Sequence, residues 1–242
     1  MFFVFDVETI PDFQFLRDVM QLDAEDEAYN DEEAVLTLAQ ENLTRNNSNF
    51  LPPMYHRMIS WVGLWIDNNG DPHKKVAWSG ENEEEGLEKL FDLLSTYKDF
   101  GLIHHNGKGF DLPLLTYRAM KHQLVMPQRM HSYDIRYRYS KANIDLLDEF
   151  SNYGASSWPK LKHLGYLIDI PFKKTAEGDQ VLEMFQNGEL EAIEHYCYED
   201  VMATYIVWLH LKHTMGDIPS DRFEDLNSRA LDKLKSIQEE NA

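Results

Sequence analysis

The amino-acid sequence predicts an α/β fold, and three observations support this prediction. An apolar run occupies residues 2–5, a hairpin pattern covers 58–78, and a strand, a glycine-containing loop and a helix follow one another at 101–122. The third feature is a βα unit, so its loop lies at the carboxyl end of a strand, where open α/β sheets bind ligands. We therefore expect the functional site at that edge of the sheet.

The first strand ends in two carboxylates. The Phe- and Val-rich run before them predicts a buried strand, and Asp6 and Glu8 follow it. Residues two apart on a strand share a face, so these carboxylates point together. Adjacent anions are stable only beside a cation, and Mg²⁺ and Mn²⁺ are the ions that prefer such oxygen ligands. The alternative is a solvated strand end with two unrelated acids.

Residues 12–57 form an acidic insertion. Acids gather at 25–27 and 31–33, a helix-prone stretch follows at 34–39, and Pro52-Pro53 closes the segment. One or two surface helices are expected. Such charge runs are typical of solvated helix faces, and a partner protein docking on them is the functional alternative.

The middle of the chain contains clear element signals. Strands at 58–66 and 75–78 flank Asn69-Gly70, a hairpin signal, so they should pair antiparallel and extend the first strand. The apolar spacing of residues 82–97 predicts a helix. A strand at 101–105 leads through the loop 106–110 into a helix at about 111–122.

The second half is expected to be mostly helical. The expected segments are a mixed connection at 124–141, a helix at 142–152, a short helix from Trp158 to Gly165 begun by Ser157 and Pro159, a mobile loop at 171–179, a helix from Gly188 or Glu189 to about His213, and a last helix at about 221–239. Asp134 and Asp145 are interpreted as helix caps or surface acids.

Charge is unevenly distributed. The net charge is −19, but residues 108–174 contain 11 Lys and Arg against 6 Asp and Glu, a net +5 that leaves −24 on the rest. Aromatic residues interleave with this basic segment, namely Tyr117, Tyr133, Tyr137, Tyr139, Tyr153 and Trp158. Basic and aromatic side chains together suit a phosphate backbone with stackable bases. A helix face covered by extended basic side chains is the alternative.

Composition favours a globular protein of a reducing compartment. Hydrophobic residues make up 43% and charged residues 27%, and Cys197 is the single cysteine, which excludes an internal disulfide. The first apolar run is too short for a signal peptide, and no stretch approaches the roughly 18 apolar residues of a membrane span. A cytoplasmic location without membrane contact is expected.

The loop at 106–110 fits neither common phosphate-binding fingerprint. Gly107-Lys108-Gly109 lacks the third glycine of a dinucleotide site, and its lysine is misplaced for an ATP-binding loop. Asp111 follows at the helix N-terminus, where it either caps the helix or supplies a third carboxylate near the first strand. His104 and His105 do not complete a zinc site; we expect one to end the strand and the other to be buried.

Three stretches resemble the motifs of the DEDD superfamily, the DnaQ-like proofreading 3′–5′ exonucleases. They are Asp6-Val7-Glu8, Asn106-x-x-x-Phe110-Asp111 and Tyr196-x-x-x-Asp200, and together they extend the resemblance over residues 1–11 and 58–211. The sequence is most similar to stand-alone exonucleases related to the proofreading domains of family B DNA polymerases.

The resemblance implies a ribonuclease H-like fold, with a mixed five-stranded sheet and helices on both faces. It implies one exonuclease domain over residues 1–242, carrying the acidic insertion at about 12–57 and an extra C-terminal helix at about 219–242.

By the same resemblance, four carboxylates hold two Mg²⁺ or Mn²⁺ ions. Asp6, Glu8 and Asp200 bind the ion that activates water. Asp6 also bridges to the second ion, which Asp111 reaches through water, and Tyr196 orients the attacking water. The tyrosine defines one subclass of the superfamily.

The sister subclass uses a histidine five residues before the last aspartate, where this chain has His195. On a helix, a residue four positions back is rotated by about 40° and one five back by about 140°, which favours Tyr196 if the helix includes residues 195–200. If the helix began later, His195 could still reach the site.

The resemblance implies that Asn106 and Phe110 hold the terminal nucleotide. Two further substrate-binding candidates are Lys108, whose place between glycines beside the site suits a phosphate, and Thr9, which follows the first motif. A core position is the alternative for Phe110, and a solvated side chain for Lys108. The expected activity is stepwise 3′–5′ hydrolysis of single-stranded DNA to nucleoside monophosphates. The alternatives are an RNA-trimming enzyme and a catalytically idle module that binds nucleic acid or a replication partner.

Overall fold

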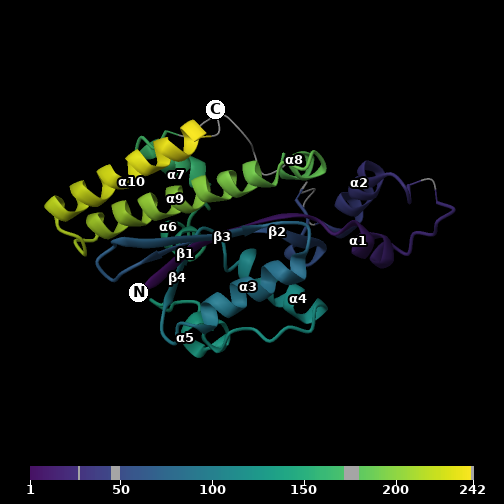
Figure 1. Cartoon of the computed structure of the whole chain (residues 1–242), viewed down its shortest axis with the longest axis horizontal. Coiled ribbons are helices and arrows are strands. Elements are labelled where there is room, and N and C mark those ends of the chain that lie inside the picture. Colours follow the sequence, from purple (N-terminus) through teal and green to yellow (C-terminus); the bar gives the residue numbers. More distant parts are fainter. Residues whose placement is uncertain (27, 45–49, 172–179, 241–242) are drawn as a thin grey trace.

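A mixed five-stranded sheet organises the computed structural model, which describes residues 1–26, 28–44, 50–171 and 180–240. The strand order is β3 (Pro72–Ser79), β2 (His56–Ile66), β1 (Phe2–Pro11), β4 (Gly101–His104) and β5 (Asn143–Asp145). β1 pairs antiparallel with β2 and parallel with β4 (Figure 1). The predicted α/β class, hairpin and ribonuclease H-like sheet are therefore confirmed.

Helices cover both faces of this sheet, as Figure 1 shows. The long helices α9 (Leu190–Thr214) and α10 (Ser220–Glu240) lie on one face, and α3 (Glu83–Ser95) and α4 (Asp111–Lys121) on the other. Phe3 and Phe5 of β1 join the core with α3 and α4, whereas Val4 joins the core with α9. Alternation along β1 therefore aims its even-numbered residues at α9.

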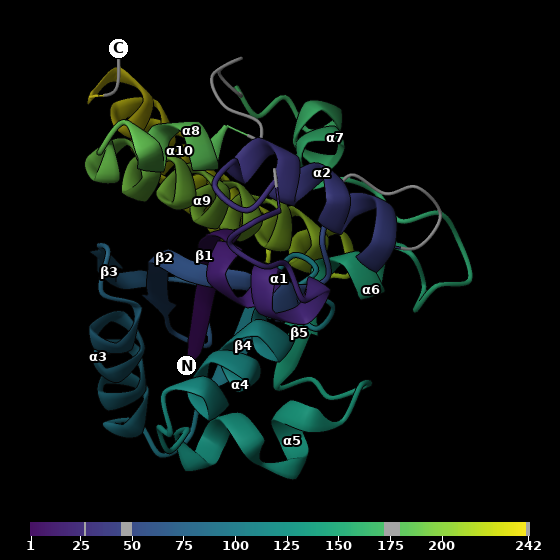
Figure 2. The same ribbon diagram turned by 90° about the vertical axis from the view of Figure 1, so that its right-hand side faces the viewer.

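The acidic insertion folds into two helices between β1 and β2, within the predicted number. Helices α1 (Phe13–Met20) and α2 (Glu32–Leu43) bury Leu16, Val35 and Ala39 against each other, and the short turn η1 (Pro53–Tyr55) leads into β2. Figure 2 shows the two helices together. Asp12 begins α1 by accepting a hydrogen bond from the Phe15 amide.

The chain from 124 to 188 differs in part from the sequence prediction. The mixed connection contains η2 (Gln128–His131) and α5 (Tyr133–Arg136). The predicted helix at 142–152 is wrong at its start, since β5 pairs with β4 there and only α6 (Leu146–Phe150) is helical. Three residues carry no readable period, and pairing with a distant strand decides their structure.

Two further helix predictions need correction. The short helix α7 (Leu161–Leu167) begins after Lys160, later than Ser157-Pro159 predicted, and α8 (Val181–Gln186) was not predicted. The predicted mobile loop lies, except for its first residue, outside the described residues. In the part of the chain that the structure describes, no helix combines the length and apolar character needed to cross a bilayer.

Candidate active site

Strand β1 and helix α9 bring the first acids of the site together. Asp6 and Glu8 lie on the even-numbered side of β1 that faces α9. One carboxylate oxygen of each and Sγ of Cys197 lie within 4.8 Å of one another. The predicted pairing of these two side chains on one face is therefore present in the fold.

The other two predicted carboxylates converge on the same place. Helix α4 begins with Asp111, beside the carboxyl end of β4, and α9 carries Asp200. All four carboxylates line one pocket of about 420 Å³. The remaining described residues of its lining are Val7, Thr9, Phe50, His105, Asn106, Phe110, Leu147, Trp158, Pro159, Lys160, Leu161 and Tyr196. We call this the carboxylate pocket.

The carboxylate pocket has an unfavourable electrostatic arrangement. Burial, together with the neighbouring carboxylates, raises the pKa values of Asp6 and Glu8 well above their ordinary range. Burial also raises the pKa of Asp111 to about 7, and burial with nearby Glu199 raises that of Asp200 to about 7. Among the described residues, no Lys, Arg or His forms an ion pair with these four acids.

The donor set fits a hard divalent cation. Four carboxylates offer oxygen ligands, which Mg²⁺ and Mn²⁺ prefer, and a bound cation would relieve the repulsion that raises their pKa values. Cys197 is the soft atom nearby, 3.7 Å from Oδ2 of Asp6. Burial raises the pKa of this thiol well above its ordinary value, so Cys197 is a neutral hydrogen-bond donor to Asp6.

Comparison with known families gives a match over most of the chain. A family described as predicted 3′–5′ exonucleases related to the exonuclease domain of PolB matches residues 48–242. The chain belongs to this family. A comparison with curated proteins found no match. The exonuclease assignment expected from the three motifs is thus confirmed, and the protein is an enzyme of the exonuclease class.

The matched range differs from the range of the resemblance at both ends. It includes α10, which the three motifs left outside, and it begins after β1, so Asp6 and Glu8 lie beyond it. The fold joins these parts, because β1 forms the centre of the sheet between β2 and β4. The exonuclease family's matched segment and the first motif therefore share one site.

Tyr196 and His195 point to different sides of the long helix α9. Tyr196 lines the carboxylate pocket one helical turn before Asp200, which lines the same pocket. His195 points elsewhere, with Nδ1 2.9 Å from the carbonyl oxygen of Glu191 and Nε2 3.7 Å from Glu240 on α10. Because α9 already begins at Leu190, the rotation argument from the sequence applies to both residues.

The second motif forms a tight loop whose shape depends on a buried acid. Asn106 has a φ of 65°, and its side chain lies at the carboxylate pocket. The Asp145 carboxylate accepts hydrogen bonds from the Asn106 and Lys108 amides at 2.8 and 3.0 Å. It also caps α6 through the Leu147 amide, so the helix-cap interpretation is confirmed. Asp134 is exposed and pairs with Arg129, a surface acid as interpreted.

Phe110 and Thr9 both line the carboxylate pocket next to His56. The half-buried Phe110 ring lies 5.3 Å from the His56 ring and 5.2 Å from Phe50. His56 Nε2 lies 3.2 Å from the Leu51 carbonyl and must donate to it, so Nδ1 accepts from the Thr9 hydroxyl at 3.0 Å. Burial lowers the pKa of His56 to about 4, which keeps this neutral form.

Lys108 does not line the carboxylate pocket. Its ammonium group donates to the Arg138 carbonyl at 2.7 Å and lies 3.3 Å from Asp148. The side chain therefore belongs to the adjacent surface, whereas the other eight predicted site residues line the pocket.

Some pocket residues belong to none of the three motifs. Lys160 and Phe50 come from loops without a recognisable motif. Trp158 lines the carboxylate pocket too, and the sequence had indicated it only as one of the aromatic residues of the basic segment. His105 lines it too and lies 3.0 Å from the Pro159 carbonyl. His104 both ends β4 and is the buried histidine, so the predicted division of the two histidines was wrong.

Proposed function

We propose that this exonuclease removes nucleoside monophosphates from the 3′ end of single-stranded DNA by a two-metal-ion mechanism. One observation carries the proposal: four carboxylates from β1, α4 and α9 line one pocket without a cationic partner among the described residues. A fold does not keep such a cluster for stability, because each added anion raises the cost of ionising the others.

Each carboxylate has a distinct place in this proposal. Asp6, Glu8 and Asp200 would hold one Mg²⁺ or Mn²⁺, and Asp6 and Asp111 would supply ligands to a second. When bound, the two ions activate a water molecule and stabilise the leaving 3′ oxygen. The charges of Asp111, Glu8 and Asp200 all act on Asp6, which is compatible with the shared position that the family resemblance assigns to it.

Tyr196 orients the attacking water in the proposed mechanism. Burial and the adjacent carboxylates raise the pKa of its phenol far above neutrality. A neutral phenol can donate and accept hydrogen bonds but cannot take the proton of water at physiological pH. Tyr196 is therefore assigned to positioning the water, and His195 is assigned no role in the reaction.

The terminal nucleotide is proposed to lie against Asn106, Phe110 and Thr9. The Phe110 ring offers a face for a base, and the Asn106 side chain offers hydrogen bonds. Because the Thr9 hydroxyl donates its hydrogen bond to Nδ1 of His56, the oxygen of Thr9 is left as an acceptor for a sugar hydroxyl. DNA is favoured as substrate because the matching family is related to the exonuclease domain of PolB.

The test is a strand-shortening assay. The protein is incubated with 5′-labelled single-stranded DNA or RNA in Mg²⁺, Mn²⁺ or EDTA, and products are separated by length. We expect stepwise shortening of DNA from the 3′ end that EDTA stops and that Asp6→Asn abolishes. Asp232→Asn is the matched control, since this exposed acid lies on α10.

Two outcomes would contradict the proposal. Faster shortening of RNA than of DNA would make the enzyme an exoribonuclease. Binding of either strand without shortening in both metals would leave the idle binding module as the better description.

A further inference from the structure

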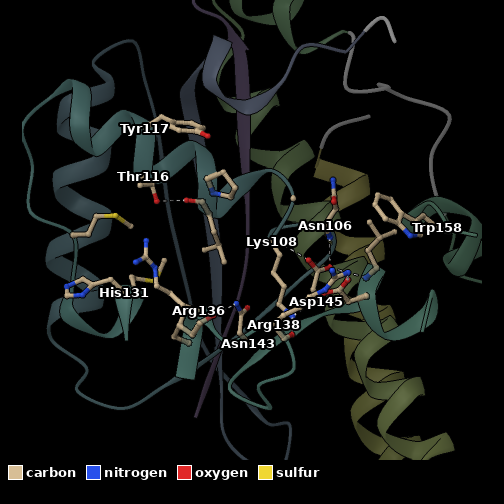
Figure 3. A pocket seen from close by; sticks show the side chains of 18 residues that line it. Asn106, Lys108, Thr116, Tyr117, His131, Arg136, Arg138, Asn143, Asp145 and Trp158 are labelled. Atoms are coloured by element: carbon tan, nitrogen blue, oxygen red, sulfur yellow. Dashed lines mark hydrogen bonds and ion pairs between the residues drawn. The ribbon is translucent and has the colours of Figure 1, made fainter. Parts of the chain in front are cut away.

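A second cavity adjoins the carboxylate pocket. It has a volume of about 600 Å³ and shares Asn106, Leu147 and Trp158 with that pocket. Figure 3 shows Asn106 and Trp158 at one end and Tyr117 and His131 at the other. We call this cavity the basic groove. A chain whose end occupies the carboxylate pocket could continue directly along it.

The charged residues of the basic groove leave one arginine available. Asp148 pairs with both Lys108 and Arg138, at 3.3 and 3.0 Å. The Asp145 carboxylate accepts hydrogen bonds from the backbone amides of Asn106 and Lys108 in the second-motif loop. Arg136 is exposed, and its side chain has no ion-pair or hydrogen-bond partner among the described residues. The groove therefore offers a free guanidinium group, which suits a phosphate.

Aromatic side chains stand at both ends of the basic groove. Tyr117 is 40% exposed and Trp158 is 64% exposed, which is high for such large rings. Leu112, Met126 and Met130 contribute an apolar lining to the groove. Exposed rings separated by a cation match the alternation of bases and phosphates in a single strand.

The location of the basic groove on this chain supports the same occupant. The protein carries a net charge of −19, which repels a polyanion overall. All of the groove's lining except Asn106 comes from the basic segment 108–174. Its charged lining is Lys108, Arg136 and Arg138 against Asp145 and Asp148, an excess of one positive charge. This positive charge lies beside the carboxylate pocket, where a phosphate chain has to be held.

We propose that the basic groove binds the nucleotides upstream of the 3′-terminal one. Trp158 stacks on the base next to the carboxylate pocket, Arg136 binds a backbone phosphate, and Tyr117 stacks on a base further upstream. The proposal rests on the proposed exonuclease function and deepens it. It predicts that the enzyme binds single strands several nucleotides long and has little affinity for dinucleotides.

The experiment compares the binding of a long and a short strand. Fluorescence anisotropy measures the affinity of the protein, in Asp6→Asn form to prevent cleavage, for labelled deoxythymidine decamer and dimer. We expect Arg136→Ala and Tyr117→Ala each to weaken decamer binding about tenfold and dimer binding less than twofold. Arg136→Ala should also reduce the slope of log affinity against log salt by about 0.7, the value for one phosphate contact.

Two control variants accompany these measurements. Tyr117→Phe keeps the ring and should retain decamer binding, which separates stacking from hydrogen bonding. Lys98→Ala removes one positive charge from an exposed site outside the groove and should leave both affinities unchanged. Far-ultraviolet circular dichroism verifies that the variants, all at exposed positions, remain folded.

The outcomes separate the groove from the reaction. The inference alone is overturned if the wild-type protein cleaves DNA but Arg136→Ala and Tyr117→Ala leave the ratio of decamer to dimer affinity unchanged. The groove would then bind something other than the substrate strand. A ratio that depends on both residues, without any cleavage, overturns the proposed function alone. No length dependence and no cleavage would overturn both.

Discussion

Two acidic clusters lie close together along the chain and have opposite electrostatic properties. Asp6 and Glu8 line the carboxylate pocket, and neither forms an ion pair with a Lys, Arg or His among the described residues. Asp12, just beyond the same strand, is buried with Glu83 around Arg118, whose guanidinium group donates to both. Lys121 also pairs with Asp12 at 2.7 Å. We call this second group the arginine cluster.

The pKa values reflect this difference. Burial alone would raise the pKa of Asp12, but hydrogen bonds from Lys121 and Arg118 bring it below its ordinary value. The pKa values of Asp6 and Glu8 are raised, because burial and neighbouring anions act in the same direction. Burial of an acid therefore does not indicate function. An acid whose counter-charge is missing from the protein is the better candidate for metal binding.

Removing the cation of the arginine cluster should produce the largest change in stability. Arg118→Ala removes the buried cation that Asp12 and Glu83 share and leaves them only Lys121 and His122 as partners. We therefore expect a loss of about 3 kcal/mol in the free energy of unfolding, the lower end of the range for breaking a buried ion pair. Urea denaturation measures this loss. Arg229→Ala is the matched control, because Arg229 is half exposed in its ion pairs with Asp225 and Asp71, and its loss should cost at most about 1 kcal/mol. Equal losses in the two variants would remove the distinction between the clusters.

Within the carboxylate pocket, Tyr196 and His195 should differ clearly in their effect on turnover. Tyr196→Phe removes the hydroxyl that orients water, and we expect kcat to fall about 10- to 100-fold with little change in KM. His195→Ala is the matched control on the same helix and should change kcat less than twofold. Single-strand hydrolysis under saturating substrate measures both. A larger loss for His195→Ala would assign the enzyme to the histidine subclass.

The smallest predicted effect is a gain in stability, in contrast to the loss expected for Arg118→Ala. The folded pKa of Asp111 is about 7 and its ordinary value is 3.8, so the stability from its protonated form is present below about pH 4 and lost as pH rises through 7. At pH 8 in EDTA, Asp111→Asn should therefore stabilise the protein by about 1 kcal/mol, or about 2–4 °C in Tm. Thermal denaturation measures the shift.

Adding Mg²⁺ provides the control for this third prediction. The ion should raise the Tm of the wild-type protein more than that of Asp111→Asn, because the variant has lost a ligand. Asp232→Asn, an exposed acid on α10, should not change Tm in either buffer. Destabilisation of Asp111→Asn in EDTA would show that Asp111 holds the fold together, as Asp12 does.

Much of the fold and of the site could be predicted from local sequence patterns. The alternation of β1 was enough to place Asp6 and Glu8 on one face, and the spacing of Tyr196 and Asp200 was enough to place them one helical turn apart. The hairpin signal at Asn69-Gly70 led to the β2–β3 pair. These features depend only on residues close together in the chain.

Other features were decided by contacts between distant residues. The three residues of β5 form a strand only because β4 lies beside them. Asp145 looked like an ordinary helix cap, yet it also holds the Asn106 loop from 39 residues away. Lys108 turns toward Asp148, away from the carboxylate pocket. None of these pairings leaves a periodic signal in the sequence.

The sequence by itself determined which acids could serve in catalysis, because strand and helix periods dictate which neighbouring side chains share a face. Only the tertiary structure decided which acids have a cationic side chain as an ion-pair partner. Asp12 and Asp6 look equivalent in the sequence, and the difference arises because Arg118, 106 residues from Asp12, packs against one of them. Coulomb energy depends on distance in space, and distance in space is what folding adds to the order of residues.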